Sequence, residues 1–139
     1  NLGNSYRDAK QFAQADDAYQ SAISVYQSTL VEAKKSDDRS KAVEVWKSIA
    51  SLYRQRKQPI DAIKTYQQAL DFLQQKQSNS PTVEDAQLTA EIYNLIGVTH
   101  YNSGQYPSAI VAFRQSLTHY ANVSNRPADV ALVGTNLGD

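Results

Sequence analysis

Residues 93–117, with the sequence YNLIGVTHYNSGQYPSAIVAFRQSL, constrain the fold more than any other stretch of the chain. The first half shows the three- and four-residue steps of one helix face, at Tyr93, Ile96, Gly97, His100 and Tyr101. The segment 103–105 breaks this pattern, because its glycine readily takes the left-handed conformation that ends a helix. The stretch therefore predicts two helices folded against each other.

The second helix of this hairpin is expected to begin near Pro107, because the first turn of a helix does not need the amide hydrogen that proline lacks. Gly97 and Ala109 are small where the two backbones must approach closely. Tyr101 and Phe113 are large and fill the space around them. The hairpin is thus predicted to pair small residues with large ones.

Related patterns recur along the chain. A small residue takes the place of Gly97 at Gly3, Ala50 and Gly138, so that the four positions are spaced by 47, 47 and 41 residues. A helix pair that cannot bury its own apolar face must stack on copies of itself. The repeat therefore predicts an all-α fold, a right-handed α-solenoid of antiparallel helix pairs.

We expect a single solenoid over residues 1–139, with the following parts: partial repeat 1 over 1–35, repeat 2 over 36–78, repeat 3 over 79–124, and the first helix of repeat 4 over 125–139. In the partial repeat, one helix is expected to end near Tyr6 and the next to begin by Phe12 and run to about Lys34. Ser80 is expected to cap the first helix of repeat 3, with Pro81 in its first turn. Because residue 1 is not methionine, we interpret the chain as a fragment.

The hairpin resembles the tetratricopeptide repeat, whose signature is an aromatic residue, a leucine-glycine pair, a tyrosine, then an alanine and an aromatic residue four positions later. Repeat 3 matches it at Tyr93, Ile96-Gly97, His100, Ala109 and Phe113, and repeat 2 at Trp46, Ile49-Ala50, Tyr53, Ala62 and Tyr66. The departures are His100 in place of tyrosine and Lys57 where glycine is usual. The spacing exceeds the usual 34 residues by about two to four helical turns. In this respect the chain is similar to the extended repeats of kinesin light chains and of the LGN/Pins family.

The resemblance implies a non-enzymatic scaffold that binds a peptide or a protein in a concave groove lined by the first helix of each repeat. By helical spacing, the candidate groove residues are Asn4, Arg7, Lys47, Ser48, Ser51, Arg54, Gln55, Asn94, Val98, Tyr101, Asn102 and Asn136. Asparagine suits this role because its side chain offers both a donor and an acceptor to a peptide backbone. For any single residue the alternative is an ordinary solvated helix face, but the row taken together favours a groove.

A basic strip is possible where Arg7, Lys47 and Arg54 follow one another along the expected groove. Tetratricopeptide domains that clamp the C-terminal carboxylate of chaperones use asparagines and lysines on these helices. Ser48 and Leu95 stand where such a clamp needs an asparagine and a basic residue, so the sequence does not favour a clamp.

Composition narrows the function classes. The chain has 14 basic and 14 acidic residues and a formal net charge of zero, which argues against binding nucleic acid or a charged membrane surface. No apolar run approaches the ~20 residues of a membrane span. Without cysteine there is no disulfide and no thiolate metal site, and the cysteine content does not determine the cellular compartment. Since no targeting segment is visible, we expect the cytoplasm.

Neither a cofactor nor a metal is expected. The chain has two histidines: His100 is interpreted as a packed, hydrogen-bonded core residue, and His119 as a residue near a helix end, where a cation is mildly favoured. No HExxH, nucleophile elbow or phosphate loop occurs in the sequence. The chain is therefore not expected to be an enzyme.

Two alternatives to the scaffold stay open. The repeats could mainly join neighbouring domains or self-assemble. An RNA-binding repeat with base-stacking tyrosines is less favoured, because the chain lacks an excess of positive charge.

Apolar residues at the two ends, among them Leu137 and Gly138, lack a covering helix in the sequence, so we expect end-to-end association.

Overall fold

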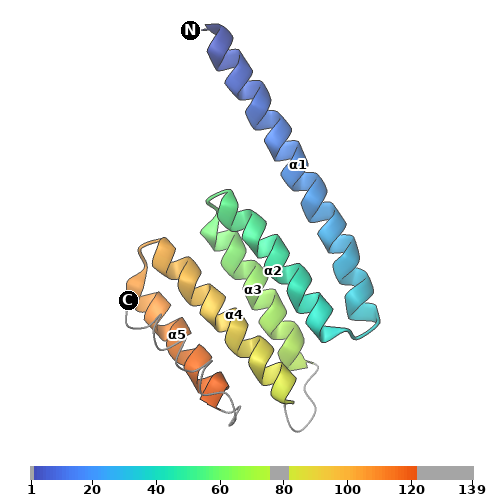
Figure 1. The fold of residues 1–139 in the computed structure, drawn as a ribbon, viewed down its shortest axis with the longest axis vertical. Helices are drawn as coiled ribbons and strands as arrows, with labels where there is room; N and C mark the ends of the chain where they lie inside the picture. The colour runs from blue at the N-terminus through green and yellow to red at the C-terminus, as the bar shows by residue number, and fades with distance from the viewer. Residues whose placement is uncertain (1, 76–81, 122–139) are drawn as a thin grey trace.

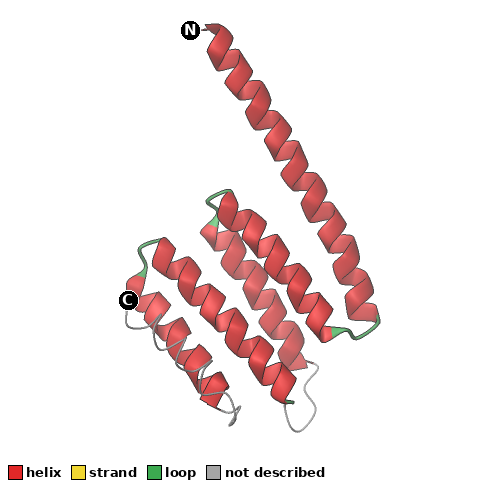
Figure 2. Cartoon of the chain, in the orientation of Figure 1, coloured by secondary structure: helices red, strands yellow, loops and turns green. Residues whose placement is uncertain are grey.

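The computed structural model describes residues 2–75 and 82–121, with side chains from residue 8 onward. In these ranges the chain forms the helices α1 (Leu2–Lys35), α2 (Arg39–Gln55), α3 (Pro59–Gln75), α4 (Val83–Asn102) and α5 (Tyr106–Ala121), and no strand. Consecutive helices run antiparallel and stack side by side, joined by short loops where the connection is described (Figures 1 and 2). The predicted all-α solenoid of antiparallel helix pairs is confirmed.

Helix α1 differs from the prediction. The expected break between Tyr6 and Phe12 is wrong, because α1 is one continuous helix of 34 residues. The five residues between them include neither glycine nor proline, so nothing in this stretch disfavours the helical conformation strongly enough to end it. The first half of α1 projects past the other helices (Figure 1), and the Phe12 side chain in it is 72% exposed.

The second half of α1 packs along α2. Arg56, which follows α2, forms an ion pair with Asp16 and lies 5.2 Å above the ring of Tyr19. Further along α1, Ile23 and Ala33 are buried. These contacts tie α1 to the rest of the solenoid from Asp16 onward.

The connections α1–α2, α2–α3 and α4–α5 use the same turn. In each, one residue has the left-handed conformation: Asp37 (φ 55°), Lys57 (φ 58°) and Gly104 (φ 78°). In each, the amide of the next residue donates to the carbonyl oxygen five residues earlier, with an N–O distance of 2.9 Å. This is the hydrogen bond of the Schellman motif, which satisfies a carbonyl that the helix end would leave unpaired. The three tight connections therefore share one geometry although their sequences differ.

Side-chain caps begin two of the helices. The Asp38 carboxylate accepts from the Lys41 amide at 3.1 Å and starts α2. The Thr82 hydroxyl oxygen accepts from the Asp85 amide at 3.0 Å and starts α4. Thr82 thus has the role that the sequence assigned to Ser80. Ser80 and Pro81 lie outside the described residues.

The core is continuous from the end of α1 to α5. Its central members are Trp46 on α2 and Tyr66 on α3, which are 3% and 1% exposed. Trp46 packs on the ring of Phe72 with the centroids 5.3 Å apart. Because burying a large aromatic contributes several kcal/mol, this cluster anchors the α2–α3 pair.

The α4–α5 pair is joined by a close approach at Gly97. A Cβ atom there would lie 2.6 Å from two ring atoms of Phe113, so only glycine fits without movement of the ring. Further along the pair, the buried Ser116 hydroxyl donates to the carbonyl oxygen of Ala90 at 2.6 Å. The predicted pairing of small and large residues is confirmed at this contact.

Candidate functional site

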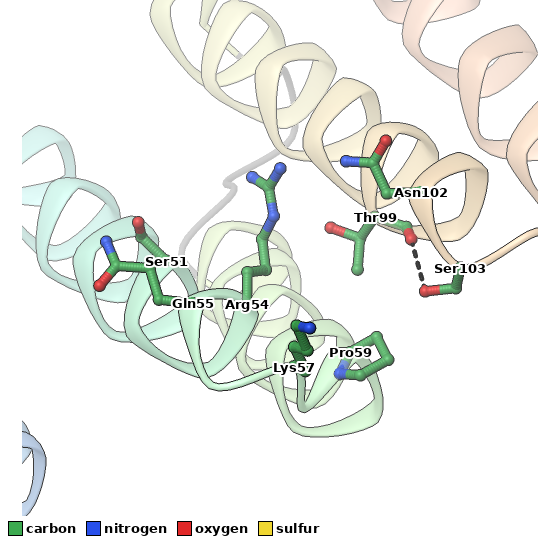
Figure 3. A pocket seen from close by; sticks show the side chains of 8 residues that line it. All are labelled: Ser51, Arg54, Gln55, Lys57, Pro59, Thr99, Asn102 and Ser103. Carbon is green, nitrogen blue, oxygen red and sulfur yellow. Dashed lines mark hydrogen bonds between the residues drawn. The ribbon is translucent and has the colours of Figure 1, made fainter. Parts of the chain in front are cut away.

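A groove opens between α2 and α4 at the ends where both helices finish. It forms a partly open cavity of about 690 Å³. Its lining comes from α2, from the turn and start of α3, and from the end of α4, namely Ser51, Arg54, Gln55, Lys57, Pro59, Thr99, Asn102 and Ser103. Figure 3 shows Arg54 reaching from α2 into the space between the two helices, with Thr99 and Asn102 on the opposite wall.

Four of the predicted groove residues line this cavity, namely Ser51, Arg54, Gln55 and Asn102. Their helices are fixed by the core, so the structure brings them together without help from a ligand. Their role in binding stays a prediction.

The other predicted groove residues do not line the cavity. Lys47 and Ser48 lie about one turn before Ser51 on α2, and Asn94 and Val98 lie earlier on α4. The Tyr101 ring packs edge-on against Tyr106 of α5, with the centroids 5.3 Å apart. For Asn4, Arg7 and Asn136, the side chains lie outside the described residues.

Four lining residues are absent from the predicted set, namely Lys57, Pro59, Thr99 and Ser103. Thr99 precedes Asn102 by three residues and therefore lies close to it around the helix, so the helical spacing could have indicated it. Lys57 and Pro59 belong to the tight turn, whose position next to the α4 end is a tertiary feature. No local pattern in the sequence indicates that proximity.

The charge of the cavity is positive. Arg54 and Lys57 line it together with neutral side chains, and no acidic residue takes part in the lining. Neither cation forms an ion pair with any side chain in the described part of the chain. A groove with two unpaired cations favours an anionic group on a ligand.

Lys47, by contrast, is already paired. Its ammonium contacts the Glu91 carboxylate of α4 and lies 3.3 Å from Oε1 of Glu44. Burial alone would lower the pKa of Lys47, but the hydrogen bonds to Glu91 and Glu44 and their charges outweigh burial and raise it. The predicted basic strip is thus interrupted, because Lys47 is neutralised by its own neighbours.

A second ion pair joins the beginnings of the same two helices. Arg39 of α2 contacts the Asp85 carboxylate of α4, and Asp85 is 2% exposed. A buried charge is costly unless it is paired and hydrogen-bonded. The two walls of the groove are therefore connected by ion pairs at two levels, Arg39–Asp85 and Lys47–Glu91.

The histidines lie away from the groove. His100 is half-buried, with Nδ1 3.0 Å from Oε1 of Gln105. Its predicted hydrogen bond is confirmed, but its core position is wrong, because it lies beside the turn that joins α4 to α5 and is only partly buried. His119 stacks on Tyr93, and burial lowers its pKa. In the part of the chain that the structure describes, no three His, Cys, Asp or Glu residues gather as a metal site would require.

The fold and the groove define a class of protein, the α-solenoids built of stacked helix pairs. Within this class, the family model for the soluble NSF attachment proteins (SNAP) matches residues 1–126, and the chain belongs to that family. No curated protein matches the chain. The repeat architecture expected from the sequence is thus established, whereas the closer likeness to the extended tetratricopeptide repeats of kinesin light chains and LGN/Pins stays a prediction. Among the described helices, none has the length and apolar character needed to cross a membrane.

Proposed function

We propose that this chain is a non-enzymatic scaffold and that a segment of a partner protein docks in the groove between α2 and α4. The observation that carries the proposal is the cavity of about 690 Å³, lined by polar side chains from two separate helices. Family membership supports it, because the family is described as an attachment protein for another protein, NSF.

The lining suits a peptide backbone. Ser51, Gln55 and Asn102 offer donors and acceptors that can pair with the amides and carbonyls of an extended segment. They stand on helices held by the core and by the Lys47–Glu91 ion pair. Because the protein side of such a site is preorganised, binding costs it little conformational entropy.

The proposed partner is a protein of the NSF type. This choice rests on the family description and on no contact in the structure. We place its docking segment in the groove rather than on α3 or α5, because the groove combines a cavity with polar side chains and with two cations that form no ion pair among the described residues.

A steric block tests the proposal. Ser51→Trp would fill part of the cavity, whereas Gln68→Trp adds the same ring to the exposed side of α3. Binding of purified NSF to each variant is measured by calorimetry, and thermal melting verifies that both variants fold. We expect Ser51→Trp to weaken binding at least about tenfold and Gln68→Trp to leave it unchanged. Equal binding by both variants would refute the groove as the docking site, and no binding by the parent chain would refute NSF as its partner.

Self-assembly is a second candidate, favoured by exposed apolar side chains at both ends of the row of helices. On α1 Phe12 is 72% exposed, and on α5 Ile110 and Val111 are 42% and 57% exposed. Apolar surface of this kind can stack on another copy. Light scattering over a concentration series should then show growing mass for the parent chain and less growth for Phe12→Ser/Ile110→Ser. A parent chain that stays monomeric at high concentration would exclude this candidate.

A further inference from the structure

The junction of α2 and α4 carries charges of opposite sign along its length. Its earlier part lies around Lys47 and Glu91, and its later part is the cavity. In the earlier part, the carboxylates of Glu44 and Glu91 share the single ammonium of Lys47. Their side chains are 69% and 42% exposed, so both remain accessible to a ligand. Two carboxylates against one ammonium leave this part with an excess of one negative charge.

The later part has the opposite sign. Arg54 and Lys57 line the cavity, and no acidic side chain does. The ends of α2 and α4 nearby carry partial negative charges of roughly half an elementary charge each. Two full positive charges exceed these partial charges, so the cavity remains positive.

Several other cations of α2 and its flanking residues are neutralised by acidic side chains. Arg39, Lys47 and Arg56 each contact an acidic side chain, whereas Arg54 and Lys57 form no ion pair within the described ranges. Lys41 on α2 and Lys64 on α3 also form no ion pair among the described residues, but both are exposed and lie outside the cavity lining.

The separation of the two parts sets a scale for the ligand. Glu44 and Arg54 are ten residues apart on α2, which corresponds to about 15 Å along the helix. An extended peptide advances about 3.3 Å per residue, so it covers this length in about five residues.

We infer that the groove accepts a segment with a basic side chain at one end and a carboxylate about five residues away, in a single direction. The basic group lies opposite Glu44 and Glu91, and the carboxylate lies opposite Arg54 and Lys57. The reverse direction brings like charges together at both ends, which disfavours it. This inference rests on the proposed docking function and adds the chemistry and the polarity of the docked segment.

Peptide selection tests this inference without knowledge of the natural partner. A display library of random twelve-residue peptides is selected on the parent chain, on Arg54→Glu/Lys57→Glu, and on the control Lys35→Glu/Lys64→Glu. The control makes the same change of net charge at exposed lysines on α1 and α3, outside the cavity lining.

We expect the parent chain and the control to select peptides with a basic and an acidic residue four to six positions apart, in one constant order. The variant Arg54→Glu/Lys57→Glu should select basic residues in place of the acidic one. A parent-selected peptide should bind this variant about tenfold or more weakly, and replacing its acidic residue with lysine should restore binding.

Two results would overturn the inference. Identical peptides from the parent and the Arg54→Glu/Lys57→Glu variant, or both charge orders in equal number, would show that the charge division does not select the ligand. If Ser51→Trp still weakens the binding of such peptides, the docking function stands and only the polarity is wrong. If no peptide is retained by any of the chains, both the polarity and the docking function are wrong.

Discussion

The α2–α3 and α4–α5 pairs are two copies of one design with different surroundings. Ala50 and Gly97 are equivalent, and each is small and buried against the second helix of its pair. Arg54 and Tyr101 are also equivalent by the 47-residue spacing, yet Arg54 lines the cavity while Tyr101 packs on Tyr106. The comparison shows that the positions facing inside the pair are fixed by packing, whereas those facing the groove are free to take on different functions.

The largest expected difference between the pairs concerns their aromatic anchors. Trp46→Ala should lower the free energy of unfolding by about 3–5 kcal/mol, because Trp46 is 3% exposed and packs on Phe72. The equivalent Tyr93 is half-buried, so Tyr93→Ala should cost less. Urea unfolding of both variants measures the difference. Equal losses would mean that the two pairs do not differ in packing as described.

The next effect concerns the close approach in the α4–α5 pair. Gly97→Ala should destabilise the chain by about 1–3 kcal/mol, because the new Cβ would lie 2.6 Å from the Phe113 ring. In the double variant Gly97→Ala/Phe113→Leu the smaller side chain should relieve part of this overpacking. The double-mutant cycle gives the coupling between the two sites. A coupling near zero would show that the ring does not cause the cost.

The turns offer a smaller effect of opposite sign. Lys57 has the left-handed conformation that Gly104 has in the equivalent turn. Such a conformation costs a residue with a side chain about 1 kcal/mol or more, so Lys57→Gly should stabilise the α2–α3 pair by about that amount. Gly104→Ala should destabilise the α4–α5 pair by a similar amount. Thermal melting of the two variants should show shifts in opposite directions; shifts in the same direction would contradict the shared turn geometry.

The smallest effect is a pH dependence in the α4–α5 pair. Burial lowers the pKa of His119 below its ordinary value of 6.5, so the unfolded chain binds a proton more readily than the folded chain. Stability should therefore fall as the pH drops below about 6.5 and through the lowered pKa. His119→Phe keeps a ring for stacking on Tyr93 and removes the titration. Urea midpoints between pH 7.5 and 5 should show a smaller decrease for this variant; an equal decrease would assign the effect to other groups.

Much of the fold could be predicted because its causes are local. The spacing of Ile96, Gly97 and Phe113 specifies a helix pair with a close contact, and the structure has that contact. The long α1 could not be predicted from the repeat pattern, because Gly3 and Tyr6 match the repeat while nothing between Tyr6 and Phe12 ends the helix.

The candidate site could be predicted only in part. Helical spacing indicated Ser51, Arg54 and Asn102, because it identifies which residues share a face. It could not indicate that Lys47 is neutralised, since Glu91 lies 44 positions away in the sequence and reaches Lys47 only through the stacking of α4 beside α2.

The most direct test of the groove is to map a bound peptide on the isotope-labelled chain by amide NMR. A peptide selected on the parent chain is titrated in, and the shift changes are assigned along the sequence. We expect the largest changes at residues 51–57 and 99–103, which form the walls of the cavity, and further changes near Glu44 and Glu91, opposite the basic end of the peptide. Changes along the exposed side of α3 around Gln68 should be small. Changes concentrated on α3 and α5, with the cavity walls unaffected, would contradict docking between α2 and α4.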